Sequence, residues 1–104
     1  MGLDQRIWAE IQVNDVRKRI AIHYWRKDYE IDDWFFSRLP KADQHAIEAE
    51  NHTAWSSNVT ALELGLLEAD EYALAFQIGF DSDLLWRCHL ALEEGFTLTY
   101  SRNS

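Results

Sequence analysis

Residues 3–13 read LDQRIWAEIQV, and this stretch decides the fold because its side chains alternate between two kinds. One set is almost wholly apolar: Leu3, Gln5, Ile7, Ala9, Ile11 and Val13. The other set is mostly polar or charged: Asp4, Arg6, Trp8, Glu10 and Gln12. A period of two residues is typical of a strand with one buried face. We therefore predict a half-buried strand over residues 3–13.

A second strand is predicted directly after the first. The pair Asn14-Asp15 has the chemistry of a tight turn, and residues 17–23 alternate again, which predicts a hairpin. Its second strand carries the basic cluster Arg17-Lys18-Arg19. Near the end of the chain, residues 96–100 read FTLTY, which predicts a third strand.

From residue 24 the hydrophobic period changes from two to the helical value. The residues that recur at spacings of three, four and seven are Tyr24, Ile31, Trp34, Phe35 and Leu39, and Pro40 follows them. This spacing predicts an amphipathic helix over residues 24–39, which proline ends. The polar residues 41–52 are predicted to form a connection or a short helix.

Two further helices are predicted in the second half of the chain. Thr60 and Glu63 have the spacing of a capping box, which predicts a helix from there to about residue 75. The apolar run 75–80 has no decidable period. Gly95 is expected to end a helix over residues 83–94. The side chains of that helix predicted to face inward are Leu84, Leu85, Cys88, Ala91 and Leu92.

Together these elements predict one α+β domain over residues 1–104, with a small antiparallel sheet packed against two or three helices. The sheet is predicted to consist of the N-terminal hairpin and the C-terminal strand. Cys88 is the only cysteine, so neither an internal disulfide nor a cysteine-based metal site can form. The sequence shows no signal peptide and no membrane span, which predicts a cytoplasmic protein.

Charge is divided unevenly along the chain, whose formal net charge is −8. Residues 1–27 hold six basic and three acidic residues, a net +3, so residues 28–104 carry −11. Such an acidic surface disfavours direct binding to nucleic acid. It favours a basic or nucleic-acid-binding protein as the partner.

Two motifs carry a resemblance to a known family: the opening Met1-Gly2-Leu3-Asp4, and Tyr24-Trp25-Arg26-Lys27 followed by Trp34-Phe35. On these motifs the chain resembles a family of small uncharacterised proteins of phages and bacterial genomes. The resemblance implies a phage or mobile-element setting and a place in the host cytoplasm, but no activity. The chain has Gln5-Arg6 where the family commonly has Met-Tyr, and Ile31-Asp32 where it tends to have Ile-His.

The predicted partner-binding residues lie close together in the sequence: Trp25, Arg26, Asp28, Glu30, Asp32 and Asp33. Trp25 lies off the apolar stripe of the predicted helix, so we expect it to be the exposed ring. The acidic residues are expected to form a solvated helix face. If the face has a binding function, its carboxylates would imitate DNA phosphates and occupy a basic groove on a partner protein. Together with the phage or mobile-element setting that the resemblance implies, this face predicts stoichiometric binding to a host protein, as an inhibitor of a nucleic-acid-handling or defence complex.

Two alternatives remain open at this point. A small-ligand domain or hydrolase would hold a phosphate or nucleotide with His23, Trp25, Arg26 and Lys27. A self-associating structural domain would form a homodimer. The sequence contains no catalytic motif, no metal-ligand spacing and no cofactor-binding motif, so we predict no catalytic residues, no metal and no cofactor.

Overall fold

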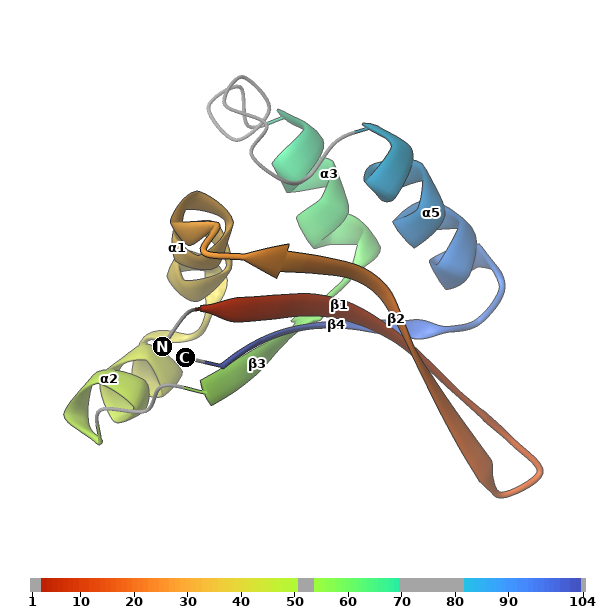
Figure 1. Ribbon diagram of the computed structural model, residues 1–104, viewed down its shortest axis with the longest axis horizontal. Helices are drawn as coiled ribbons and strands as arrows, with labels where there is room; N and C mark the ends of the chain where they lie inside the picture. The colour runs from red at the N-terminus through yellow and green to blue at the C-terminus, as the bar shows by residue number, and fades with distance from the viewer. Residues whose placement is uncertain (1–2, 51–53, 70–81, 104) are drawn as a thin grey trace.

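The computed structural model describes residues 3–50, 54–69 and 82–103. Its strands form one antiparallel sheet in the order β2-β1-β4-β3, which confirms the α+β prediction (Figure 1). The strands are β1 (Asp4–Val13), β2 (Val16–Arg26), β3 (Ala54–Val59) and β4 (Thr97–Asn103). The predicted hairpin and C-terminal strand are present, and β3 is an additional edge strand.

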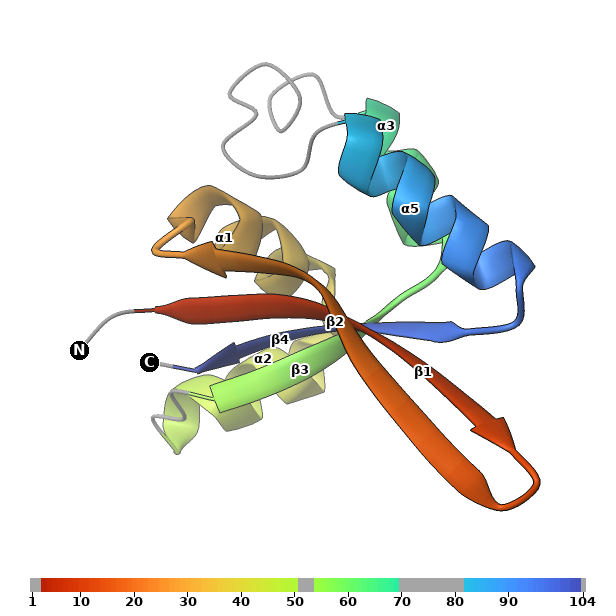
Figure 2. The same cartoon turned by 45° about the vertical axis from the view of Figure 1, so that its right-hand side comes forward.

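The described residues contain four helices, where two or three were predicted. They are α1 (Tyr29–Arg38), α2 (Lys41–Ala49), α3 (Ala61–Ala69) and α5 (Ser82–Glu93). Helices α1, α3 and α5 lie over one face of the sheet (Figures 1 and 2). Helix α2 lies beside β3, where Ile47 lines a shallow cleft with Ala54 and Ser56. The helical layer therefore determines which face of each strand is buried.

The β1–β2 hairpin turns where the sequence predicts. Asn14 and Asp15 have φ angles of 50° and 65°, which is the left-handed pair that a two-residue type I′ turn requires. The register shifts once, because Ile7 pairs with His23 whereas Trp8 pairs with Ala21. Ile22 is thus an extra residue in β2, and this β-bulge bends the edge strand.

The helix predicted to begin at residue 24 begins five residues later. Residues 24–26 continue β2 instead, pairing with β1 as far as Arg26 opposite Asp4. The direction of the chain changes at Lys27, whose φ is 60°, and Asp28 then caps α1 by accepting the Ile31 amide. The side chains of Tyr24-Trp25-Arg26 fit both the strand period of two residues and the helical period, and these residues form a strand because they pair with β1.

Both predicted helix-end signals are confirmed. At α3, Thr60 and Glu63 form the reciprocal capping box, in which each side chain accepts the other residue's backbone amide. At α5, Gly95 has φ 92° and donates its amide to Leu92, while Phe96 donates to Ala91. This pair of bonds is the Schellman ending that favours glycine. The predicted extension of α3 to about residue 75 and the run 75–80 lie outside the described residues.

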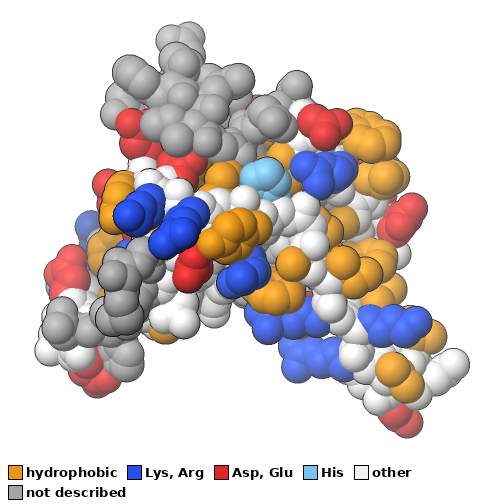
Figure 3. All heavy atoms as spheres, in the orientation of Figure 1, with side chains coloured by type: hydrophobic (Ala, Val, Ile, Leu, Met, Phe, Trp, Pro, Cys, Tyr) orange, Lys and Arg blue, Asp and Glu red, His pale blue; other side chains and the backbone are white. Residues whose placement is uncertain are grey.

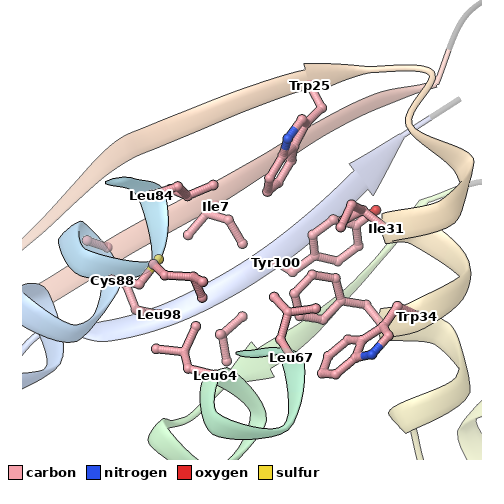
Figure 4. Close-up of a cluster of buried hydrophobic side chains, with 14 residues drawn as sticks. Ile7, Trp25, Ile31, Trp34, Leu64, Leu67, Leu84, Cys88, Leu98 and Tyr100 are labelled. Carbon is pink, nitrogen blue, oxygen red and sulfur yellow. The ribbon is translucent and has the colours of Figure 1, made fainter. Parts of the chain in front are cut away.

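The core lies between the sheet and the helical layer, around the ring of Tyr100 (Figure 4). Phe35 of α1 stacks on this ring, with ring centroids 4.3 Å apart. The predicted inward side of α5 is confirmed, and Cys88 is fully buried among apolar side chains. Burial raises the pKa of the Cys88 thiol to about 12, so the thiol is an uncharged core group at neutral pH.

The turn geometry predicts how Asp15 substitutions change stability. Asp15→Gly should tolerate φ 65° without steric cost, whereas Asp15→Ala should keep that cost and lose the polar side chain. We expect the glycine variant to exceed the alanine variant by about 1 kcal/mol in the free energy of unfolding. Urea denaturation of the two variants measures the difference, and equal stabilities would contradict the type I′ assignment.

Candidate functional site

The side chain of Gln5 fastens the junction between β2 and α1. Gln5 Oε1 accepts the Asp28 backbone N–H at 2.8 Å, and Gln5 Nε2 donates to the Asp28 carbonyl at 2.9 Å. Gln5 is the second residue of β1, on the buried side of the strand, and is itself fully buried. An amide side chain fits here because it can satisfy both a donor and an acceptor of the same backbone residue.

The same hydrogen-bond network continues to α1 and β4. Gln5 Nε2 also donates to the Tyr100 hydroxyl at 2.8 Å, and that hydroxyl donates to Asp32 Oδ1 at 2.6 Å. Arg102 donates to both Asp32 oxygens at 3.2 Å, so the ion pair is bidentate. Burial and the Asp32 hydrogen bond raise the pKa of Tyr100 far above its usual value. The hydroxyl therefore acts as a fixed hydrogen-bond donor.

The carboxyl group of Asp28 is only partly satisfied. Its Oδ1 accepts the Ile31 amide at 3.2 Å, while Oδ2 is buried and meets no donor among the described residues. Desolvation raises the pKa of Asp28, and the amides of Ile31 and Glu30 oppose that rise. An N-cap with one oxygen lacking a donor fixes the start of α1 at the cost of burying a charge.

The predicted acidic and aromatic recognition surface is not assembled as expected. Trp25, predicted to be exposed, retains only 6% of its exposure, because it lies on a strand and faces the helices. The solvated helix face is wrong for Asp28 and Asp32, which are buried as the cap of α1 and the partner of Arg102. Arg26 and Asp33 are exposed, and Glu30 is half-buried. The six residues therefore do not share one surface.

The residues predicted for a phosphate or nucleotide pocket are also divided between environments. His23 and Trp25 lie against each other on the helical side of β2, with ring centroids 4.5 Å apart. Arg26 pairs with Asp4 on the opposite face, and the backbone of Lys27 donates to Leu3. The pairing of β2 with β1 separates the four residues, because neighbouring strand residues point to opposite faces.

The opposite face of the sheet carries a different cluster, the arginine–aromatic surface, formed by Arg6, Trp8, Arg19 and Tyr24. The Arg19 guanidinium lies 3.8 Å from the centroid of the Trp8 ring, and the Arg6 guanidinium lies 4.8 Å from that of Tyr24. Trp8 Nε1 donates to Ser101 at 2.8 Å. The indole and the two guanidinium groups are thereby held in defined positions on a rigid sheet.

The net charge of this face is opposite in sign to that of the whole chain. Four arginines and two carboxylates project from it in register, which gives a net +2: Arg6, Arg17, Arg19, Arg26, Asp4 and Glu10. Glu10 binds Arg17 at 2.6 Å and Arg19 at 3.1 Å, and Asp4 accepts the Tyr24 hydroxyl at 2.5 Å. That hydrogen bond raises the pKa of Tyr24.

A shallow groove of about 400 Å³ crosses the arginine–aromatic surface. Besides charged residues that include Arg6 and Arg19, its lining includes Ser56, Ser101 and Asn103 of β3 and β4. Indole, guanidinium and hydroxyl groups are thus exposed together on one face of the sheet. Such a surface can make hydrogen bonds, stacking contacts and charged contacts with a partner.

Sequence reasoning missed the arginine–aromatic surface, although one signal for it was present. Trp8 is the single apolar residue in the polar set of β1, and a tryptophan on the solvent side of a strand is the kind of residue found at interfaces. The pairing of Arg6 with Tyr24 and of Trp8 with Ala21 depends on the hairpin register. The Ile22 bulge sets that register, and alternation alone does not locate it.

Comparisons with protein-family models, curated proteins and solved structures found no match. Within the described residues, no three histidine, cysteine, aspartate or glutamate side chains converge as a metal site would require. In the same part of the chain, no helix combines the length and apolar character of a membrane span. Function must therefore be inferred from the geometry of the surfaces.

Because Asp32 binds both Arg102 and the Tyr100 hydroxyl, we expect its substitution to destabilise the protein more than substitution of Tyr100. Asp32→Asn removes the charge facing Arg102, and we expect a loss of roughly 3 kcal/mol in the free energy of unfolding, as for a broken buried pair. Tyr100→Phe removes one hydroxyl and should cost about 1–2 kcal/mol. Urea denaturation measures both variants. A smaller loss for Asp32→Asn than for Tyr100→Phe would contradict the assignment.

The raised pKa of Asp28 predicts a pH dependence with a defined sign. Because burial raises the pKa of Asp28, folding favours the protonated carboxyl. The stability that this preference adds is fully present below the pKa of Asp28 in the unfolded chain, and it is lost as pH rises through the pKa in the folded chain. Asp28→Asn keeps a capping side chain but cannot titrate. The stability of Asp28→Asn relative to wild type should therefore increase between about pH 3 and pH 7. Chemical denaturation across this range tests it, and a decrease would contradict the burial.

Proposed function

We propose that this chain acts by stoichiometric binding to another protein and that the arginine–aromatic surface is the contact. The main observation behind this proposal is that side-chain contacts fix the positions of four residues on the sheet face away from α1, α3 and α5: Arg6, Trp8, Arg19 and Tyr24. Tryptophan, tyrosine and arginine are the residues that dominate binding energy at protein interfaces. A rigid sheet also lowers the entropy cost of binding.

The charge of this surface supports a partner with acidic groups at its contact. The face has a net +2 within a chain of net −8, so complementarity there favours carboxylates on the partner. This reverses the charge expected from the sequence, which favoured a basic partner. A DNA-like acidic face on α1 would have to depend on Asp33 and the half-buried Glu30, because Asp28 and Asp32 are buried.

The resemblance to small phage and bacterial proteins supports looking for the partner in a bacterial cell. An accessory protein of that setting that blocks a host complex needs an interface and no active site. The interior polar residues fit this, since Gln5, Tyr100 and Asp32 bind one another and hold the fold together. The proposed role is therefore that of an inhibitor or adaptor.

The test is capture of the tagged protein with its partner from nuclease-treated lysate of the native host, followed by affinity measurement with the purified partner. Arg6→Glu with Tyr24→Ala should weaken binding by about 30-fold or more, the effect of losing a hot spot. The matched control, Lys41→Glu with Tyr29→Ala, makes the same kind of charge reversal and tyrosine truncation on the exposed surfaces of α2 and α1, and should change affinity less than about twofold.

Two outcomes would contradict the proposal. Equal affinities for the Arg6/Tyr24 variant and its control would exclude the arginine–aromatic surface. A loss of binding for Glu30→Lys with Asp33→Lys, with the Arg6/Tyr24 variant unaffected, would instead place the contact on the acidic side of α1.

A further inference from the structure

The end of the β1–β2 hairpin extends beyond the helical layer as an arm, residues 11–20 (Figures 1 and 2). The side chains of the arm that share the face of Ala9 are largely apolar, by the register of the hairpin. Val13, Val16 and Ile20 keep 49%, 55% and 53% of their exposure. The row of apolar side chains that is buried at Ala9 therefore continues along the arm, beyond the part of the sheet that the helices cover.

An apolar cleft of about 220 Å³ lies between the root of this arm and α5. Ile20 and Ile22 line it from β2, Phe96 lines it from the residue before β4, and Leu90 and Ala91 line it from α5. Trp86 precedes Leu90 by one helical turn on α5 and is 61% exposed. Figure 3 shows hydrophobic side chains gathered on this side of the molecule, with basic side chains nearby.

The arm needs a covering partner on energetic grounds. A two-stranded ribbon is at best marginally stable in water unless one face packs against something else. Val13, Val16 and Ile20 are each about half exposed, so a partner that covered them would remove further apolar surface from water and stabilise the complex. Contiguous exposed apolar groups of this kind mark an interaction surface more often than chance.

Sheet extension through β2 is not the way this surface is covered. Arg87 of α5 donates its Nη1 to the Ile22 carbonyl at 2.8 Å, and Ile22 is the bulged residue of the edge strand. A bulge and an engaged carbonyl both interrupt the ladder that an added strand would need. The partner must instead contact the side-chain surface of the arm and the cleft.

Charge complementarity indicates that the partner is a second copy of this chain. The arm carries Arg17, Lys18 and Arg19; Glu10 engages the two arginines, whereas Lys18 has no carboxylate within ion-pair distance among the described residues. The C-terminal end of α5 carries Glu93 and Glu94, both exposed, and Glu94 lies at the rim of the cleft. The arm thus carries Val16 close to the cation of Lys18, and the cleft on α5 is apolar with the carboxylates of Glu93 and Glu94 beside it. The two surfaces are complementary.

We propose that the chain forms a two-fold symmetric homodimer in which the arm of each copy lies across α5 of the other. Val16 of one copy enters the cleft beside Leu90 of the other, and Lys18 faces Glu93 and Glu94. The two-fold axis makes both contacts identical, which closes the assembly at two copies. This dimer leaves both arginine–aromatic surfaces exposed, so it is independent of the proposed partner binding.

Sedimentation equilibrium at protein concentrations from about 1 to 100 µM, a range that covers moderate affinities, tests the dimer. Wild type should fit a monomer–dimer equilibrium. Val16→Asp should weaken dimerisation at least about tenfold, since a charge would enter an apolar cleft. Leu62→Asp, a change of the same kind at an exposed position of α3, should leave it unchanged. A wild type that is monomeric throughout, or equal effects of the two variants, would overturn the proposal.

A charge exchange tests the contact without altering apolar packing. Lys18→Glu and Glu94→Lys should each weaken the dimer by up to about fivefold, as expected for exposed ion pairs. The double variant should dimerise more tightly than either single variant, although Glu93 remains opposite the new Glu at position 18. Failure of recovery, with circular dichroism showing folded variants, would exclude this arrangement of arm and helix. Retained partner binding by the Val16→Asp variant separates this result from a failure of the proposed function.

Discussion

The fold depends on one buried hydrogen-bond chain that runs from Gln5 through the Tyr100 hydroxyl to Asp32. Gln5 also binds the backbone of Asp28, so β1 holds the junction between β2 and α1 in place. Each polar group in this chain would cost free energy if buried alone, and together they satisfy one another. The position of α1, and with it the stacking of Phe35 on Tyr100, follows from this arrangement.

Local signals in the sequence predict much of the fold because they depend on neighbouring residues. The alternation of β1, the Asn14-Asp15 turn, the Thr60 capping box and the Gly95 ending are all of this kind. The start of α1 could not be predicted from spacing, because Tyr24-Trp25-Arg26 satisfies two periods and only pairing with β1 decides. The missed strand β3, with its Ser56-Ser57-Asn58 centre, depends likewise on a distant partner, β4.

The candidate site was harder to predict than the fold, and charge explains why. Net charge along the chain indicated an acidic protein for a basic partner, but folding gathers arginines on one face of the sheet. Two acidic residues of the predicted recognition surface, Asp28 and Asp32, are buried for structural reasons. Gln5 of β1 and Asp32 of α1 meet at the Tyr100 hydroxyl. Their tertiary role is not visible in a linear motif.

Amide hydrogen exchange at Asp28 measures whether Gln5 holds the strand-to-helix junction in place. This amide lies outside both β2 and α1 and donates to a side chain. We expect this amide to exchange as slowly as the core amides of β1, with protection approaching the free energy of global unfolding. Exchange as fast as in an exposed turn such as Asn14-Asp15 would show that Gln5 does not fix the junction.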